Sequence, residues 1–339
     1  MTFSEVLRAH AARYPEMREG DFLKLCYQHA LGCGHLVKDE AEAVRRIRAE
    51  RAPGEEGVSF EPIGNGLVRM HLKGMDARFS DETAARMFMY TAETFHPAPD
   101  ALESALQTLA ETFPTDAMRA AIAAYRAEGC PMVSHTEAYR RAYAPAYRVV
   151  SERFARYAAL FEAAARLPEG AIFALDGMCA SGKTSLSNAL GFVFRAPVFH
   201  MDDFFLPAEK RTKERLSEVG GNVDRERFRE EVLAPLAAGR TVSYRRFDCG
   251  TMTILPPVEI KPGRLNIVEG AYACHPELRG YYARTACLTV PPEEQLRRIR
   301  QRNGERALEV FQNKWIPLEE RYFEAFQIEQ RCESCFQNE

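Results

Sequence analysis

The feature that most constrains this 339-residue chain is a glycine-rich turn between an apolar run and a helical pattern. Ala171–Leu175 is typical of a buried strand, and residues 184–190 have helical spacing. The turn between them matches G-x-x-x-x-G-K-[ST] in full, with Gly177, Met178, Cys179, Ala180, Ser181, Gly182, Lys183 and Thr184. Glycines let backbone N–H groups turn inward around phosphate oxygens, and a helix N-terminus adds partial positive charge. The sequence therefore predicts a nucleotide phosphate-binding loop.

The residues of this loop also indicate which ligands it binds. Lys183 can reach the β- and γ-phosphates of a nucleotide, and the hydroxyl of Thr184 can bind Mg²⁺. Ser185, the next residue, is expected to contribute to the same nucleotide site. A base-recognition motif of the G-protein kind, N-K-x-D, is absent, because Asn313-Lys314-Trp315-Ile316 lacks the Asp. We therefore expect ATP and Mg²⁺ as the cofactors.

The pattern of hydrophobic residues changes near residues 165–170, which indicates a domain boundary there. Beyond this point short apolar runs alternate with helical patterns, which predicts an α/β domain over 166–339 with a parallel sheet and helices on both faces. The runs expected to be buried strands of that sheet are 171–175, 197–201, 241–244, 265–268 and 286–290. Helices are expected at 184–190, 225–238 and 293–302.

The first 165 residues are expected to form a mostly helical domain. Asp21 is a candidate cap for a helix that ends at Gly32, and Thr115 for one that ends near Gly129. Asp100 with Glu103 gives a capping-box pattern, and residues 148–166 form a further helical run. Phe60–Leu72 contains two glycines between short apolar pieces, which favours a small hairpin.

Composition excludes several classes of protein. Hydrophobic residues make up 46% and charged residues 27%, the balance of a folded globular chain. The net charge of −3 argues against a nucleic-acid partner, since backbone-binding proteins are usually basic. No stretch approaches the ~18 apolar residues of a membrane span. Nine scattered Cys indicate reduced thiols, so we expect a cytoplasmic protein, and the sequence leaves a homo-oligomer open.

Two carboxylates follow the strand expected at 197–201. Ligands of open parallel sheets bind at the carboxyl ends of the strands, so Asp202 and Asp203 should lie close to the γ-phosphate. A carboxylate in that place can accept the proton of an attacking hydroxyl or hold a metal ion. Solvated acids at a strand end are also common, but the position directly after the loop helix favours the functional interpretation.

The order of these motifs resembles that of the uridine kinase and phosphoribulokinase family, over residues 171–330. The loop matches the family's opening, and Asp202-Asp203-Phe204-Phe205 matches its D-S-F-Y segment. Asn222-Val223-Asp224 with Phe228 matches N-F-D…F, Phe247-Asp248 matches a Y-D pair, and Ile267–Gly270 matches a strand that ends in E-G. Arg297, Arg298, Arg300, Arg302 and Arg306 fall where the family has an arginine-rich lid.

The resemblance implies a kinase that transfers the γ-phosphoryl group of ATP to a hydroxyl of a small molecule, such as a nucleoside or a similar polyol. It makes Asp202 the catalytic base and places Glu269 with Thr184 at the metal. It assigns Arg298 and Arg302 to catalysis, Arg306 to ATP, and the acceptor to Asp202, Asp203, Asp224, Asp248 and Tyr272. Residues 248–253 contain no His, although uridine kinases have one after the Y-D pair to read the pyrimidine.

Two alternatives remain open, an ATPase switch whose N-terminal domain binds a partner, and a bifunctional enzyme with a second activity in the first half. His35 could lie beside a ligand there, and polar and aromatic groups cluster at 134–148. Histidines such as His35 and His135 are more often surface residues. Cys332-x-x-Cys335 supplies half of a zinc site, and we interpret it as a tail.

Overall fold

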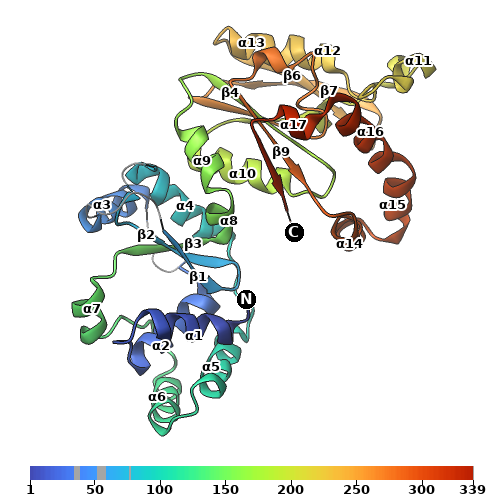
Figure 1. Ribbon diagram of the computed structural model, residues 1–339. Coiled ribbons are helices and arrows are strands. Elements are labelled where there is room, and N and C mark those ends of the chain that lie inside the picture. The colour runs from blue at the N-terminus through green and yellow to red at the C-terminus, as the bar shows by residue number, and fades with distance from the viewer. Residues whose placement is uncertain (34–38, 52–58, 76–77, 339) are drawn as a thin grey trace. The chain divides into compact units, whose positions relative to one another are not determined.

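The computed structural model describes residues 1–33, 39–51, 59–75 and 78–338, and they form two compact units, Met1–Glu162 and Ala163–Glu339. Each unit is described by itself, and Figure 1 traces the elements of both. His35 of the sequence analysis lies outside the described residues.

The first unit is largely helical, with one small antiparallel sheet in the order β1-β2-β3. Its strands are β1 (Phe60–Gly64), β2 (Leu67–His71) and β3 (Tyr147–Ser151). Its helices are α1 (Phe3–Arg13), α2 (Glu19–Leu31), α3 (Glu40–Glu50), α4 (Asp81–Thr94), α5 (Ala101–Thr112), α6 (Asp116–Ala127), α7 (Glu137–Tyr143), α8 (Glu152–Arg156) and, across the boundary between the units, α9 (Ala158–Ala165).

Local signals in this unit are confirmed in part. The hairpin at 60–72 is present, with Asn65 and Gly66 at positive φ in its turn. Thr115 caps α6 by accepting a hydrogen bond from the Met118 amide. Asp100 precedes α5, but its side chain makes no capping bond.

Two expectations for this unit are wrong. The run 148–166 is not one helix, because Val149 and Val150 pair with β2 before α8 begins. Valine is β-branched, and such residues favour a strand where an existing hairpin offers an edge to pair with. Asp21 lies in the first turn of α2 instead of capping it, and its side chain is fully buried.

The second unit is an α/β fold with a five-stranded, all-parallel sheet in the order β10-β9-β4-β8-β5. The strands are β4 (Ala171–Gly177), β5 (Val198–His200), β8 (Leu265–Glu269), β9 (Arg284–Thr289) and β10 (Ser334–Gln337). The helices are α10 (Lys183–Phe194), α11 (Lys213–Ser217), α12 (Arg225–Phe228), α13 (Ala234–Ala237), α14 (Pro292–Asn303), α15 (Glu305–Val310), α16 (Ile316–Phe326) and α17 (Ile328–Arg331). Shorter helical turns are η3 (Met201–Phe204), η4 (Ala208–Lys210), η5 (Arg229–Leu233), η6 (Arg279–Tyr281) and η7 (Phe311–Trp315).

The central strand β4 is buried along its whole length, and its two faces pack against different helices. Ile172 and Ala174 belong to a core that includes Val232, Leu236 and Tyr322 from the helices on one side. Alternate residues of a strand point to opposite faces, which leaves Phe173 and Leu175 for the other side, where α10 packs on β4. Helices therefore cover both faces of the sheet, as predicted.

Two assignments in this unit change. The run 241–244 is not a strand of the parallel sheet, because β6 (Val242–Asp248) pairs antiparallel with β7 (Thr253–Ile260) in a separate hairpin. Its burial alternates, with Val242, Tyr244 and Phe247 inside, which is typical of a sheet with one solvated face. The Cys332–Cys335 segment is not a tail, because β10 pairs in parallel with β9.

Candidate active site

The glycine-rich loop follows β4 at the carboxyl edge of the sheet, where its backbone takes a conformation that few residues allow. Gly182 has φ +92° and Ala180 has φ +58°. A Cβ on Gly177 would lie 2.7 Å from the carbonyl oxygen of Leu288, so that position has no room for a side chain. The loop ends in the first turn of α10, which begins at Lys183. Backbone amides and a helix N-terminus thus face the same space, which suits an anion.

Side chains from distant elements hold this loop in place. Glu319 of α16 accepts a hydrogen bond of 2.7 Å from the Cys179 amide, and the amide of Gln295 in α14 donates to the Cys179 carbonyl at 3.0 Å. Asn338, directly after β10, donates to the carbonyl oxygen of Ser181 at 2.7 Å. Burial raises the pKa of Glu319, while the charge of Lys183 opposes that rise. None of these three supports was predicted, because each comes from outside the loop motif.

Thr184, Glu269 and His200 meet where three strands end. β8 pairs with both β4 and β5, so Glu269 lies opposite Leu175 on one side and opposite His200 on the other. The Thr184 hydroxyl is 3.4 Å from one Glu269 oxygen and 3.5 Å from the other. Nδ1 of His200 bonds to the same carboxylate, and that bond raises the pKa of His200. His200 is a site residue that the sequence analysis missed, although strand register could have found it.

Asp202 and Asp203 lie in η3, the turn that follows β5. Asp202 opens to solvent, yet protein surrounds it closely enough for desolvation to raise its pKa; the charge of Lys183 lowers that pKa, and Glu269 raises it. Because β5 pairs with β8, Asp202 follows a strand end that is next to the end carrying Glu269. Burial also raises the pKa of Asp203, which accepts a hydrogen bond of 3.4 Å from the Tyr244 hydroxyl.

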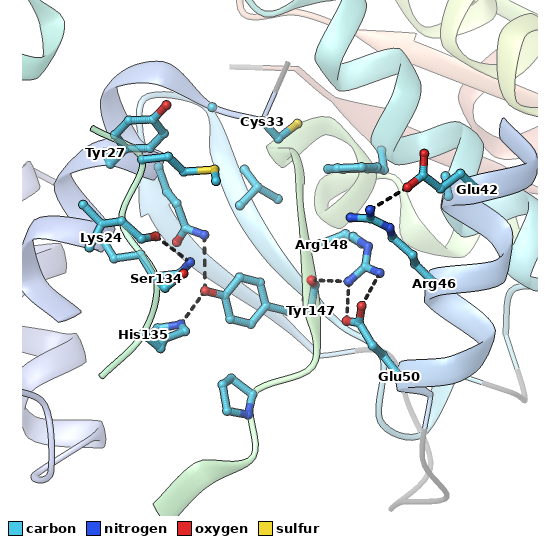
Figure 2. Close-up of a pocket in the computed structure, with 18 of the residues that line it drawn as sticks. Lys24, Tyr27, Cys33, Glu42, Arg46, Glu50, Ser134, His135, Tyr147 and Arg148 are labelled. Atoms are coloured by element: carbon cyan, nitrogen blue, oxygen red, sulfur yellow. Dashed lines mark hydrogen bonds and ion pairs between the residues drawn. The ribbon is translucent and has the colours of Figure 1, made fainter. Parts of the chain in front are cut away.

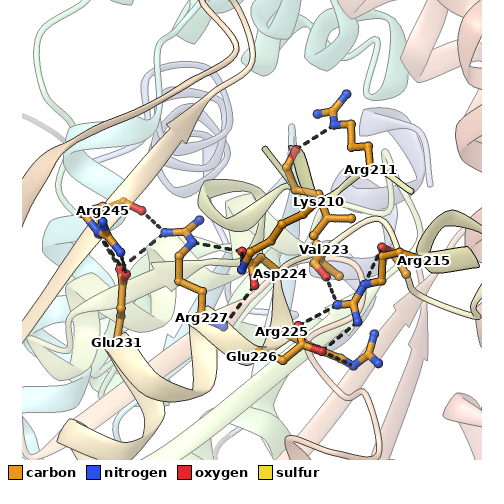
Figure 3. A network of polar contacts seen from close by, with 12 residues as sticks. Lys210, Arg211, Arg215, Val223, Asp224, Arg225, Glu226, Arg227, Glu231 and Arg245 are labelled. Carbon is orange, nitrogen blue, oxygen red and sulfur yellow. Dashed lines mark hydrogen bonds and ion pairs between the residues drawn. The ribbon is translucent and has the colours of Figure 1, made fainter. Parts of the chain in front are cut away.

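Asp224 is fully buried in a polar network (Figure 3). Its carboxylate caps α12 and forms an ion pair of 2.9 Å with Lys210. Arg227 lies 3.5 Å from the same carboxylate, donates to the Asp203 carbonyl oxygen at 3.2 Å, and covers the ring of Phe204. The network therefore fixes the backbone that carries Asp202 and Asp203.

The structure does not bring Asp248 and Tyr272 to this group by any described contact. Asp248 lies in the turn of the β6–β7 hairpin, where it accepts hydrogen bonds from the Gly250 amide at 2.8 Å and the Thr251 hydroxyl at 2.9 Å. Tyr272 has φ +72° and is buried in the core, with its ring 4.8 Å from that of Tyr322. Their assignment to the acceptor stays a prediction.

Two of the three assigned lid arginines line the phosphate loop. An open pocket of about 230 Å³ is bounded by the loop from Ala180 to Ser185 and by Arg298 and Arg302 of α14. Arg298 donates to the Ala180 carbonyl oxygen at 3.2 Å, and the charge of Arg302 lowers the pKa of Asp202. Arg306 is exposed on α15 and does not line this pocket.

The donor atoms present fit a nucleotide with its magnesium ion. Thr184 and Glu269 offer hard oxygen ligands beside the loop, and Mg²⁺ in phosphate sites takes most of its other ligands from water and phosphate. Within the described ranges no group of three or more His, Cys, Asp or Glu side chains is arranged to hold a metal ion. A metal at this place would therefore depend on a bound phosphate. No helix among the described residues is long and apolar enough to cross a membrane.

Comparisons with solved structures find that about half of this chain is similar to proteins named as kinases. No protein-family model matches the sequence, and no curated protein matches it. A "Possible Uridine Kinase" from Bacillus stearothermophilus has 22% identity and a TM-score of 0.44, over 55% of this chain and 99% of that one. A "putative fructose transport system kinase" from Silicibacter sp. TM1040 has 25% identity and a TM-score of 0.43, over 50% and 91%. A gluconokinase from Sinorhizobium meliloti 1021 has 14% identity and a TM-score of 0.29, over 51% and 85%. All three are named as small-molecule kinases, and the similarity to this chain is distant.

Proposed function

We propose that the unit Ala163–Glu339 is a phosphotransferase that moves the γ-phosphoryl group of ATP to a hydroxyl of a small molecule, a nucleoside or a similar polyol. The observation that carries this proposal is the position of Asp202. It lies in η3 directly after β5, beside the strand β8 that carries Glu269, and burial raises its pKa, which suits a proton acceptor. A loop for nucleotide binding alone requires no such group.

Each residue has a role that follows from its geometry. Loop amides and Lys183 bind the phosphates, and Arg298 and Arg302, which line the same pocket, neutralise the charge of the phosphates. Thr184 and Glu269 would hold Mg²⁺, which offsets charge on the transferred group. Asp202 orients the acceptor hydroxyl and takes its proton as the oxygen attacks phosphorus. Arginines above the loop also exclude water, which limits wasteful hydrolysis.

The acceptor would bind beside η3. Asp203 is held there by Tyr244, and its partly exposed carboxylate can accept hydrogen bonds from further hydroxyls of a polyol. Asp224 is committed to Lys210 and to its helix cap, so it would meet an acceptor only if Lys210 moved. This favours Asp203 over Asp224 as the direct acceptor contact.

A phosphorylation assay tests the proposal. The full chain is incubated with ATP and Mg²⁺ and a panel of nucleosides, pantothenate-like alcohols, glycerate and sugar phosphates, and the phosphorylated product is measured. We expect turnover with a hydroxyl compound. Asp202→Asn should lower kcat by about 10²–10⁴-fold with ATP binding retained, because only proton transfer is lost. Lys183→Ala should lower it by about 10²–10³-fold through lost charge stabilisation.

The control is Asp116→Asn, an isosteric change at a side chain that is 98% exposed in the first unit, and it should leave turnover unchanged. Full turnover by Asp202→Asn would show that another group takes the proton. ATP hydrolysis that no metabolite affects, but that a macromolecule stimulates, would instead identify an ATPase switch.

A further inference from the structure

The first unit contains a pocket that the proposed kinase reaction does not use. It measures about 310 Å³ and is bounded by α2, α3, the segment before α7, and β3 (Figure 2). Its lining includes the basic side chains Lys24, Arg46 and Arg148, the acidic side chains Asp39, Glu42 and Glu50, and the polar side chains His135, Tyr147 and Ser134, with Phe88, Met132 and Val149 as apolar surface. The pocket belongs entirely to residues 24–149, so it is a property of this unit alone.

His135 and Tyr147 of the pocket lining belong to a chain of three hydrogen-bonded side chains, whose third member, Asp21, is buried behind them. Asp21 is fully buried, and Nδ1 of His135 lies 2.9 Å from its carboxylate. Nε2 of His135 lies 2.6 Å from the hydroxyl of Tyr147. Burial alone would raise the pKa of Asp21, but hydrogen bonds from Thr136 and His135 outweigh it and the pKa is lowered. An ionised Asp21 accepts only, so His135 carries its proton on Nδ1, and Tyr147 donates to Nε2.

A second layer holds this chain rigid. The amide nitrogen of Gln28 donates to the Tyr147 hydroxyl at 3.2 Å, and its amide oxygen accepts from the buried Arg69 guanidinium at 2.8 and 3.1 Å. Arg69 also lies 4.6 Å from the centre of the Tyr147 ring and 3.5 Å from Glu61. Arg69 therefore has its own counter-ion and keeps the hydroxyl of Tyr147 in one position.

Lys24 differs from the other charges of the pocket. Arg148 pairs with Glu50 at 2.7 and 2.9 Å, and Arg46 pairs with Glu42 at 2.5 Å. Nζ of the half-buried Lys24 donates to the Val133 carbonyl oxygen at 3.1 Å, but no carboxylate of the described part of the chain lies within ion-pair distance of it. Burial and the nearby charges of Arg69 and Arg140 lower its pKa to about 8, and the charge of the buried Asp21 opposes this only in part. A desolvated ammonium without a counter-ion is costly unless an anion binds beside it.

We propose that this pocket binds a small organic anion, whose carboxylate or phosphate group pairs with Lys24 beside the Asp21–His135–Tyr147 chain. The apolar body of the ligand would contact Met132 and Phe88. The site is independent of the kinase reaction, so either assignment can fail without the other.

Competitive acetylation of the full chain tests this proposal. The protein is treated with a trace of acetic anhydride, and the acetylation of Lys24 is measured by mass spectrometry relative to Lys73, which is exposed in the same unit. Sodium benzoate and phenyl phosphate are the anionic probes, and benzyl alcohol is an uncharged analogue of similar shape. We expect one anion to lower the rate at Lys24 about fivefold at about four times its Kd. Benzyl alcohol should not lower it, and Lys73 should not respond to any of the three.

Whichever of the two anions protects identifies the carboxylate or the phosphate as the preferred group. Equal protection by benzyl alcohol, or none by either anion, overturns the proposal. A matched pair of variants gives a second readout. The protecting anion should raise the melting temperature of Lys73→Met as it does that of the wild type, and should have no such effect on Lys24→Met. An equal rise in Lys24→Met also overturns the assignment.

Discussion

The two units gather their polar groups in opposite ways. In the second, Gly177, Glu269 and Asp202 lie at or just after the ends of neighbouring parallel strands, at one edge of the sheet, beside an open pocket. In the first, Asp21, Arg69 and His135 come from separate segments and are buried. Strand-end groups can be positioned by a motif and a register, whereas buried groups depend on one another. We therefore expect substitutions to affect mainly activity in the second unit and mainly stability in the first.

The largest effect is expected for Arg69→Met in the first unit. Arg69 is fully buried, and its removal leaves the Gln28 amide oxygen without its donor and takes a buried arginine from beside Glu61. Arg13 and two histidines remain near that carboxylate. We expect unfolding of the first unit to become easier by about 3–5 kcal/mol, the cost of breaking a buried pair. Urea unfolding monitored by far-ultraviolet circular dichroism measures this change in the free energy of unfolding. Asp202→Asn, by contrast, should leave the unfolding midpoint almost unchanged, and a similar loss in both variants would remove the contrast.

Acid should also destabilise the first unit before the second. Burial lowers the pKa of His135 to about 4, below its ordinary value of 6.5. At His135 the unfolded chain therefore binds a proton more readily than the folded chain does. The stability that neutral His135 contributes is fully present above pH 6.5 and is lost as the pH falls toward 4. The loss should reach at most about 3 kcal/mol. The melting temperature of His135→Gln should change less between pH 4 and 7 than that of the wild type. An equal change in the two proteins would contradict this prediction.

A smaller effect is expected at the sheet edge of the second unit. Cys335 of β10 lies opposite Cys287 of β9, with 2.7 Å between the sulfur atoms. Hydrogen peroxide should oxidise this pair to a disulfide, as two thiols lose two protons and two electrons and the peroxide is reduced to two waters. Unfolding of the second unit should then cost about 2 kcal/mol more.

Peptide mapping of the oxidised chain identifies the bond, and Cys335→Ser is the control that cannot form it. A bond between Cys274 and Cys332, whose sulfur atoms are 3.8 Å apart, or a metal retained by these thiols, would contradict the assignment.

The smallest effect concerns the pH dependence of magnesium binding. The bond to Glu269 raises the pKa of His200, so near and below pH 6.5 a protonated His200 occupies the carboxylate that Mg²⁺ needs. As the pH rises through this raised pKa the pair weakens, and magnesium-dependent nucleotide affinity should increase severalfold, about 1 kcal/mol. A fluorescent nucleotide titrated at several pH values measures it. His200→Asn should remove most of this dependence; an unchanged profile would rule out the competition.

The sequence predicts the second unit better than the first for a physical reason. The loop at Gly177–Thr184 and the strand ends at Asp202 and Glu269 depend on local chemistry that a short window contains. His200 was missed because its role comes from register with β8, and Asn338 because its partner is 157 residues away. The hairpin β6–β7 was placed in the main sheet because an apolar run does not show which strand it pairs with.

In the first unit no window contains the relevant contacts. His135 bonds to Asp21 across 114 residues and Arg69 to Gln28 across 41, and each side chain alone is typical of a surface position. Lys24 is notable only because a carboxylate is missing beside it, and a sequence cannot show that. Long-range polar packing of this kind requires coordinates.

The strand β10 has a practical consequence for work on this protein. Asn338 follows β10 directly, bonds to the loop carbonyl of Ser181, and approaches Gly182 so closely that a Cβ there would lie 2.6 Å from its amide nitrogen. A fluorophore attached at position 338 would therefore lie beside the phosphate loop. The emission of such a fluorophore would report whether the loop is occupied.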